Sequence, residues 1–141
     1  MILLDTNVVS EPMRSNPDPR VVAWLDAQPA EGLYLSTISL AEFLLGIENL
    51  PSGKRRKALA AALDSQLLAL FGERILSFDA QAAKLFPKLV MRARRRGYAA
   101  AAADAQIAAI AAFHRLTVAT RDVSPFEAAG VPTIDPWVAA Q

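Results

Sequence analysis

Short apolar segments alternate with longer segments of helical periodicity along this chain, and this alternation limits the possible folds more than any other feature. Five segments are interpreted as β-strands: Met1–Leu4, Leu33–Ser36, Arg74–Phe78, Leu116–Ala119 and Val131–Ile134. Because strands that alternate with helical patterns are typical of βαβ units, the sequence predicts an α/β layer fold with a mostly parallel sheet flanked by helices.

The predicted helices between these strands carry recognisable start signals. Asp18 followed by Pro19 is typical of an N-cap with proline at the first helical position. The expected helices are Arg20–Ala27, a helix that Ser39 opens, Lys54–Phe71, a helix from Asp79 to near Gly97, and Ala100–Arg115.

Length and composition narrow the functional classes. The chain has 141 residues, which fits one domain over residues 1–141. It contains no cysteine, which excludes disulfides, thiolate metal sites and a cysteine nucleophile. No secretory leader is visible, and the most apolar segment, Tyr98–Phe113, is interrupted by Asp104 and Gln106. We therefore expect a cytoplasmic protein with no membrane partner.

Four acidic residues occupy positions where a site is expected in such a fold. Asp5 directly follows the first predicted strand, and Asp122 lies just after the fourth. In open parallel sheets, ligands bind beyond the carboxyl ends of the strands. Glu42 and Asp104 lie near the starts of predicted helices, which face the same edge of the sheet.

Two of these acids have a local structural interpretation in the first half of the chain. Asp5 could cap a short helix around Val8–Glu11, and Glu42 completes a capping-box pattern with Ser39. The segment Leu40–Leu45 is apolar on nearly every side, however. A lone acid in such a buried helix must be capped, paired or bound to a cation.

The other two acids also have local alternatives. Asp104 would complement the helix dipole in a first turn, although its spacing from Ile107 places it on the buried stripe. Asp122 could form an Asx turn, cap a helix at Ser124, or pair with Arg121.

Taken together, the four carboxylates favour a different interpretation. Clustered carboxylates repel one another, and burial adds a desolvation cost, so without a cation some would have to take up protons. A hard divalent ion relieves this conflict, and oxygen ligands suit Mg²⁺ or Mn²⁺. The absence of cysteine and the single histidine argue against zinc. The predicted metal ligands are Asp5, Glu42, Asp104 and Asp122.

Other residues have weaker signals. Basic clusters at residues 54–57 and at Arg92 with residues 94–96 are either solvated helix faces or phosphate contacts. His114 lies on the order of 15 Å along the helix from Asp104 and is not expected in the site. The two tryptophans are interpreted as core or interface anchors: Trp24 and Trp137.

Several segments resemble one known family, in the family's order and over the whole chain. The opening Met1–Asn7 (MILLDTN) resembles that of PIN-domain ribonucleases, in particular VapC-type toxins. Further matches are Ile38–Glu42 (ISLAE), Asp104–Ala109 (DAQIAA) and Val118–Asp122 (VATRD). The ending Gly130–Trp137 (GVPTIDPW) is similar to that of the FitB branch.

The resemblance implies a three-layer PIN-like fold and Mg²⁺- or Mn²⁺-dependent cleavage of RNA phosphodiester bonds. It also implies a homodimer that acts as a toxin and is inhibited by a cognate antitoxin. Asp5, Glu42, Asp104 and Asp122 would be the catalytic acids, and Thr6, Asn7 and Thr120 the supporting polar residues. Many relatives have asparagine at position 122 and aspartate three residues later. Here position 125 is proline, so Asp122 is expected to supply the fourth carboxylate.

Two other functional classes remain alternatives at this point. A catalytically silent PIN-like module would bind RNA or protein without cutting, but its acids would repel phosphate unless a metal intervened. A phosphatase could also use aspartates at strand ends, but Asn7 stands where an Asp-x-Asp motif requires its second acid. The sequence does not identify the RNA, the number of metal ions or the antitoxin.

Overall fold

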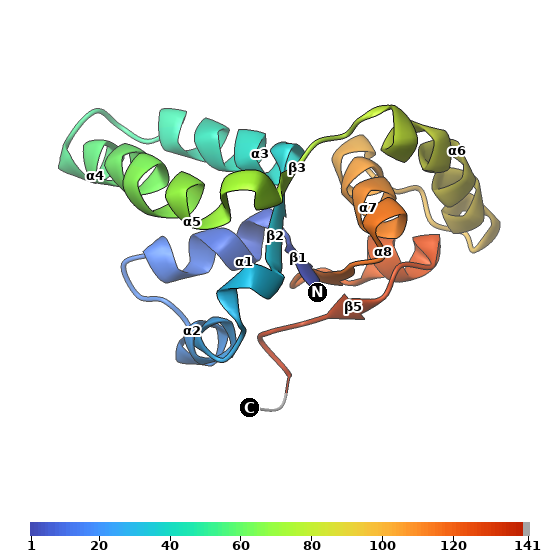
Figure 1. Ribbon diagram of the computed structural model, residues 1–141, viewed down its shortest axis with the longest axis horizontal. Coiled ribbons are helices and arrows are strands. Elements are labelled where there is room, and N and C mark those ends of the chain that lie inside the picture. The colour runs from blue at the N-terminus through green and yellow to red at the C-terminus, as the bar shows by residue number, and fades with distance from the viewer. Residues whose placement is uncertain (140–141) are drawn as a thin grey trace.

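The predicted parallel sheet is present and has five strands. A computed structural model describes residues 1–139, and in it every strand pairing is parallel. The strands are β1 Ile2–Leu4, β2 Leu33–Ser36, β3 Ile75–Leu76, β4 Thr117–Ala119 and β5 Thr133–Ile134. The bounds of β2 are as predicted, and the other four strands are shorter than predicted. Their order across the sheet is β3-β2-β1-β4-β5 (Figure 1). This confirms the predicted α/β fold with a parallel sheet.

The strand order places a topological switch point at the centre of the sheet. After β1, the chain moves outward through β2 and β3, and then returns to the other side of β1 to form β4 and β5. Leu4 is in register with Leu35 on one side and with Ala119 on the other. Ligands in such sheets bind beyond the carboxyl ends of the strands at this switch point, which here means after Leu4 and Ala119.

Two helical layers cover the sheet, one on each face (Figure 1). One layer contains α1 Thr6–Ser10, α2 Pro19–Asp26, α3 Thr37–Glu48, α4 Lys54–Ala62 and α5 Ala69–Phe71. The other contains α6 Ala80–Arg95, α7 Ala102–His114 and α8 Ser124–Ala129. Short 3₁₀ turns at Glu11–Met13, Ala30–Gly32 and Gly72–Arg74 and a π-helical segment at Leu63–Leu68 complete the elements. No helix within residues 1–139 is long and apolar enough to cross a membrane.

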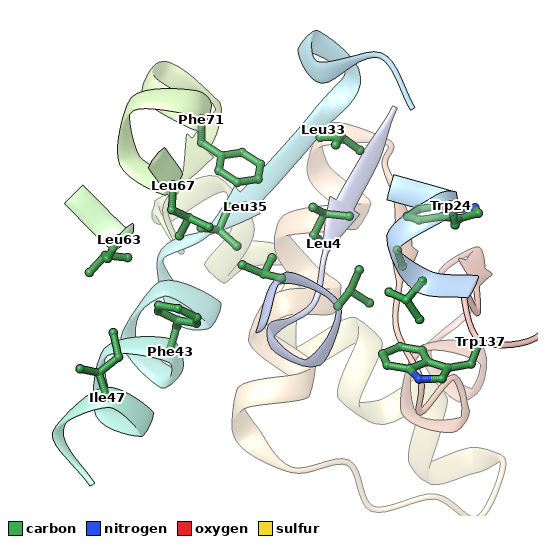
Figure 2. Packing of buried hydrophobic residues seen from close by; sticks show 14 residues of the cluster. Leu4, Trp24, Leu33, Leu35, Phe43, Ile47, Leu63, Leu67, Phe71 and Trp137 are labelled. Carbon is green, nitrogen blue, oxygen red and sulfur yellow. The ribbon is translucent and has the colours of Figure 1, made fainter. Parts of the chain in front are cut away.

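The side chains of each strand point alternately to the two faces of the sheet, and this divides the core into two clusters. Leu4 and Ala119 pack with the first helical layer, whereas Leu3 and Val118 pack with the second. Successive side chains of a strand point to opposite faces, so each face of the sheet buries its own set. Figure 2 shows the first cluster around Leu4, and Trp24 and Trp137, each 5% exposed, are core residues within it.

Several helix boundaries confirm the predicted signals, and one corrects them. The Asp18 carboxylate accepts from the Arg20 N–H at 2.9 Å and caps α2, as expected. The helix predicted to open at Ser39 begins at Thr37, because the hydroxyl of Ser36 accepts from the Ser39 N–H at 3.0 Å. The capping-box interpretation is therefore wrong.

The exposure of α3 also differs from expectation. This helix was predicted to be buried on nearly every side, but Leu44 is 42% and Leu45 is 61% exposed. Phe43 and Ile47, by contrast, point together into the core (Figure 2). The helix covers the sheet with one face only, and its other apolar face remains at the surface.

Candidate metal-binding site

Asp5 is the most constrained of the four predicted acids. Its backbone N–H donates to the Ala119 carbonyl at 2.9 Å, so the end of β1 is fastened to the end of β4. Its side chain is nearly buried and accepts from the Thr6 N–H at 2.9 Å and from the Thr120 hydroxyl at 2.8 Å. Asp5 is the N-cap of α1, so the capping interpretation is correct and leaves the rest of the carboxylate available.

Thr120 joins the ends of the two central strands. It is fully buried directly after β4, and its hydroxyl donates to Asp5 Oδ2. The same hydroxyl oxygen accepts from the Asp122 N–H at 3.2 Å. One side chain therefore orients the Asp5 carboxylate and holds the backbone that carries Asp122.

Glu42 reaches the cluster from the second turn of α3. Its Oε1 accepts from the Thr6 hydroxyl at 2.9 Å, while the rest of the residue is exposed. Thr6 therefore contacts two of the predicted acids, with its N–H on Asp5 and its hydroxyl on Glu42. Sequence reasoning named Thr6 only through the family resemblance, and its geometry agrees with a supporting role.

Asp104 enters from the opposite helical layer. It lies in the first turn of α7, as predicted, and is half-buried. The α7 helix contacts α3, and the charge of Glu42 acts on Asp104. Asp104 is therefore available to the cluster from the second face of the sheet.

Asp122 is exposed after β4, and two of its alternatives are wrong. Val123, not Asp122, is the N-cap of α8, and it makes no side-chain cap hydrogen bond. Arg121 places its guanidinium 5.0 Å from the centre of the Trp137 ring, and the part of the chain that the structure describes shows no ion pair between Arg121 and Asp122. Neither local role accounts for Asp122.

The electrostatics indicate that the four carboxylates are neighbours. Burial raises the pKa of Asp5, hydrogen bonds from Thr120 and Thr6 lower it, and the charges of Glu42 and Asp122 raise it again, with a net rise above the ordinary value. Burial also raises the pKa of Asp104, and the charges of the other three acids add to that rise. Acids from four chain segments thus lie within electrostatic reach of one another.

The side chains do not form a ready-made ligand shell. Among residues 1–139, no group of three or more His, Cys, Asp or Glu side chains is arranged to hold a metal ion as it stands. The donors themselves suit a hard divalent cation, because every one is a carboxylate oxygen. Asp122 is exposed, and Glu42 is exposed but accepts a hydrogen bond from Thr6, so a closed shell requires a change in their side-chain torsions.

Some polar residues lie outside this network. Asn7, expected as a supporting residue, has a buried Oδ1 with no hydrogen-bond partner in residues 1–139. Sequence reasoning missed the buried Glu11, which accepts from the Asp18 N–H at 2.8 Å and pairs with Arg14 at 3.3 Å. These partners satisfy Glu11 structurally. His114 is exposed at the end of α7, away from the first turn that carries Asp104, as expected.

Replacing Thr120 with valine should raise the pKa of Asp5 further and weaken the fold. The change leaves a nearly buried carboxylate without its hydroxyl donor, which typically costs about 1–3 kcal/mol. NMR titration of the Asp5 carboxyl carbon and urea unfolding would measure the two effects. Thr117→Val, in the strand β4 that Thr120 directly follows, is the matched control. Equal effects of the two variants would contradict the assigned role of Thr120.

The raised pKa of Asp104 predicts how stability depends on pH in metal-free buffer. A carboxyl group that binds its proton more tightly when folded destabilises the fold while it is ionised. This penalty is present at pH 7 and is relieved as the pH falls through the folded pKa towards the ordinary value of 3.8. The free energy of unfolding of the wild type, relative to Asp104→Asn, should therefore rise as the pH is lowered from 7 towards 4. A constant difference in urea unfolding across that range would contradict the prediction.

Comparison with known proteins gives the same assignment for the chain as the sequence motifs. The family model described as PIN domain matches residues 2–131. Toxin FitB from Neisseria gonorrhoeae is 49% identical over 137 residues, which are 97% of this chain and 99% of that protein. VapC ribonuclease Y4jK from Sinorhizobium fredii is 46% identical over 137 residues, which are 97% of this chain and 98% of that protein.

A solved structure agrees at the level of the backbone. The crystal structure of FitAcB from Neisseria gonorrhoeae superposes with a TM-score of 0.95 at 48% sequence identity, and the match covers 99% of this chain and 100% of that chain. The predicted resemblance to PIN-domain proteins, with FitB among the relatives, is confirmed. The chain belongs to the PIN domain family, in the group that includes FitB and the VapC ribonuclease.

Proposed function

We propose that this protein is a divalent-metal-dependent ribonuclease that hydrolyses RNA phosphodiester bonds as the toxin of a toxin–antitoxin pair. One observation carries the proposal: Thr6 joins Asp5 to Glu42 and Thr120 orients Asp5 at the ends of the two central strands, and the charges of these acids contribute to the raised pKa of Asp104. The names of the two relatives, a toxin and a ribonuclease, support the same activity.

The proposed catalytic residues are the four acids. Asp5 and Asp104 would be the principal ligands of Mg²⁺ or Mn²⁺, and Glu42 and Asp122 would complete the shell directly or through water. When bound, such an ion would supply activation of water and stabilisation of negative charge on the phosphate. The donor chemistry fits, because carboxylates that repel one another gain from a shared hard cation.

The protein's own groups would orient the carboxylates and take the proton from the attacking water. Thr120 holds the Asp5 carboxylate by a hydrogen bond at 2.8 Å, so Asp5 would need little reorganisation when substrate arrives, whereas Glu42, which accepts from Thr6 at 2.9 Å, would turn towards the ion. Over residues 1–139 the only histidine is exposed at the far end of α7. A carboxylate of the cluster would therefore accept the proton of the attacking water.

The proposal extends to partners and location. The exposed apolar face of α3, with Leu44 and Leu45, suits the homodimer that the family resemblance implies. A cognate antitoxin would inhibit the enzyme, and residues 1–141 would act as one catalytic domain in the cytoplasm, where RNA is available.

Thermal unfolding with Mn²⁺ and a cleavage assay test the proposal together. Binding to the folded state alone should raise stability by about 2.7 kcal/mol at an Mn²⁺ concentration 100-fold above Kd. The increase should be much smaller for Asp104→Asn, and single-stranded RNA should be cut with Mn²⁺ but not with EDTA. If Mn²⁺ gives no shift and RNA is bound uncut even in EDTA, the protein is a silent binding module and the proposal fails.

A further inference from the structure

An open groove begins directly at the candidate site. It has a volume of about 240 Å³, lies between α1, α3 and α4, and is lined by Thr6 and Glu42 together with apolar side chains. Thr6 and Glu42 belong to the carboxylate network described above. Whatever binds in the groove is therefore adjacent to the metal-binding acids.

A glycine without a structural explanation forms part of this groove. Gly46 lines it one helical turn beyond Glu42, on the same face of α3. Glycine inside a helix costs stability relative to alanine. A Cβ added at Gly46 would meet nothing within 4 Å, and its backbone is helical. Packing therefore does not require glycine here, and its effect is to leave the groove open beside Glu42.

The groove also carries an uncompensated positive charge. Arg55 lines it and donates only to neutral groups, the Ser15 hydroxyl at 3.4 Å and the Met13 carbonyl at 3.5 Å. It forms no salt bridge in the part of the chain that the structure describes. Its neighbour Arg56 pairs with Glu48. Of the basic residues 54–57, Arg55 is the one that lines the groove, and it is available to neutralise an anion beside the site.

The second basic cluster has a structural use on the other side of the sheet. Arg92 donates to the Ala129 carbonyl at 3.1 Å, and Arg96 donates to the Glu127 carbonyl at 2.8 Å, so both hold the end of α8. Their helix, α6, packs in the opposite layer from α3 and α4 (Figure 1). Of the two basic clusters, the one at residues 54–57 is the one that contributes a side chain, Arg55, to the groove beside the candidate site.

We propose that this groove binds the nucleotide next to the scissile phosphate of a single-stranded RNA. Arg55 contacts the phosphate of that nucleotide, and its base lies in the space above Gly46, against the apolar side chains of Leu50 and Leu59. Single strands present unstacked bases that stack on aromatic side chains and arginine planes, and Phe43 and Arg55 both line the groove. The volume is below the range of about 300–1,000 Å³ of pockets for drug-sized ligands, which suits one base.

Continuity and charge favour RNA as the occupant. A strand cut at the acids must continue past Glu42, and the groove is the adjoining depression there. A basic groove that follows the backbone is the usual arrangement for single-stranded nucleic acid. The inference rests on the proposed ribonuclease function, and a segment of the antitoxin is the competing occupant that the experiment must distinguish.

Two variants with matched controls test the groove. Gly46→Leu places a side chain in the groove from a position whose Cβ meets nothing within 4 Å, and Ala60→Leu introduces leucine on the exposed surface of α4 as the control. Arg55→Ala removes the free cation, and Lys57→Ala removes one exposed charge from the same cluster. The assay is steady-state cleavage of a fluorogenic single-stranded RNA of mixed sequence with Mn²⁺, and thermal shift with Mn²⁺ checks that the acids remain intact.

The expected result is a change in KM and not in kcat. Gly46→Leu should raise KM about 10-fold, the loss expected for one base contact, with kcat changed by less than about 2-fold and both controls like wild type. Arg55→Ala should raise KM and make the dependence of log(kcat/KM) on log salt shallower by about 0.7, the value for one phosphate on a single strand.

Three results would overturn the assignment, and they are distinguishable. If Gly46→Leu and Arg55→Ala keep the wild-type KM, the groove does not bind substrate. If KM is unchanged but inhibition by the antitoxin weakens, the groove is a protein docking site. If wild type and controls alike fail to cut RNA with Mn²⁺, the proposed function itself has failed.

Discussion

Replacing Asp5 with asparagine should abolish RNA cleavage while the fold remains intact. Asparagine caps helices as well as aspartate does, so α1 keeps its cap. The variant nevertheless loses one of the proposed negative ligands of the metal and the acceptor that Thr120 orients at 2.8 Å. Changes even to outer-shell partners of metals typically cost about 10–100-fold, so a direct ligand should cost at least about 100-fold in kcat.

The measurement is cleavage of single-stranded RNA with Mn²⁺, with protein that passes the same thermal-unfolding check as wild type. Asp64→Asn is the matched control, because Asp64 is exposed and lies in the Leu63–Leu68 segment away from the four acids. Undiminished cleavage by Asp5→Asn would remove Asp5 from the catalytic set. Equal losses of cleavage in Asp5→Asn and Asp64→Asn would show that the loss of one negative charge anywhere on the protein lowers the activity, and not the loss of a group at the site.

The largest effect on stability should come from Phe126→Ala. Phe126 is 1% exposed and packs in the cluster formed by α6, α7, α8 and the strand residues Leu3 and Val118. Truncating a buried phenylalanine to alanine typically costs about 3–5 kcal/mol, because the cavity relaxes only partly. In a domain of this size, that loss lowers the melting temperature by about 10 °C or more.

Urea unfolding measures this loss, with Phe113→Ala as the control. Phe113 is 42% exposed at the end of α7, so its removal should cost less than about 1 kcal/mol. A similar loss for the two variants would mean that the second core cluster does not support the sheet as described.

The fold was predictable because its main signals are local. Alternation of apolar runs with helical periodicity gave the α/β class, and Asp18 and Asp79 cap the helices that they were expected to start. Strand ends were less predictable: β3 contains only Ile75 and Leu76, because pairing with β2 reaches only those residues. Such pairing depends on a partner strand that periodicity cannot locate.

Burial on α3 could not be predicted for a related reason. A helix that is apolar all round does not reveal which face meets the core, and the structure buries Phe43 and Ile47 while exposing Leu44 and Leu45. Glu42 consequently lies at the surface, although it was expected in a buried helix. The exposed position leaves Glu42 able to turn towards a bound ion.

The positions of the four acids could be predicted in part from topology. Asp5 and Asp122 follow strands that are neighbours in the sheet, and the rule for parallel sheets therefore places them at one edge. The hydrogen bonds of Thr6 and Thr120 could not be derived in the same way, because they depend on contacts between residues up to 115 positions apart. The family resemblance named these residues, and the structure shows the contacts they make.

The most direct test of the account is a crystal soaked in Mn²⁺ and measured near the manganese absorption edge. The predicted result is an anomalous peak between the carboxylates of Asp5 and Asp104, at about 2.0–2.3 Å from their oxygens, with Glu42 or Asp122 turned towards it. Diffraction from a well-ordered crystal with no peak at these acids, or with manganese bound only elsewhere on the surface, would contradict it.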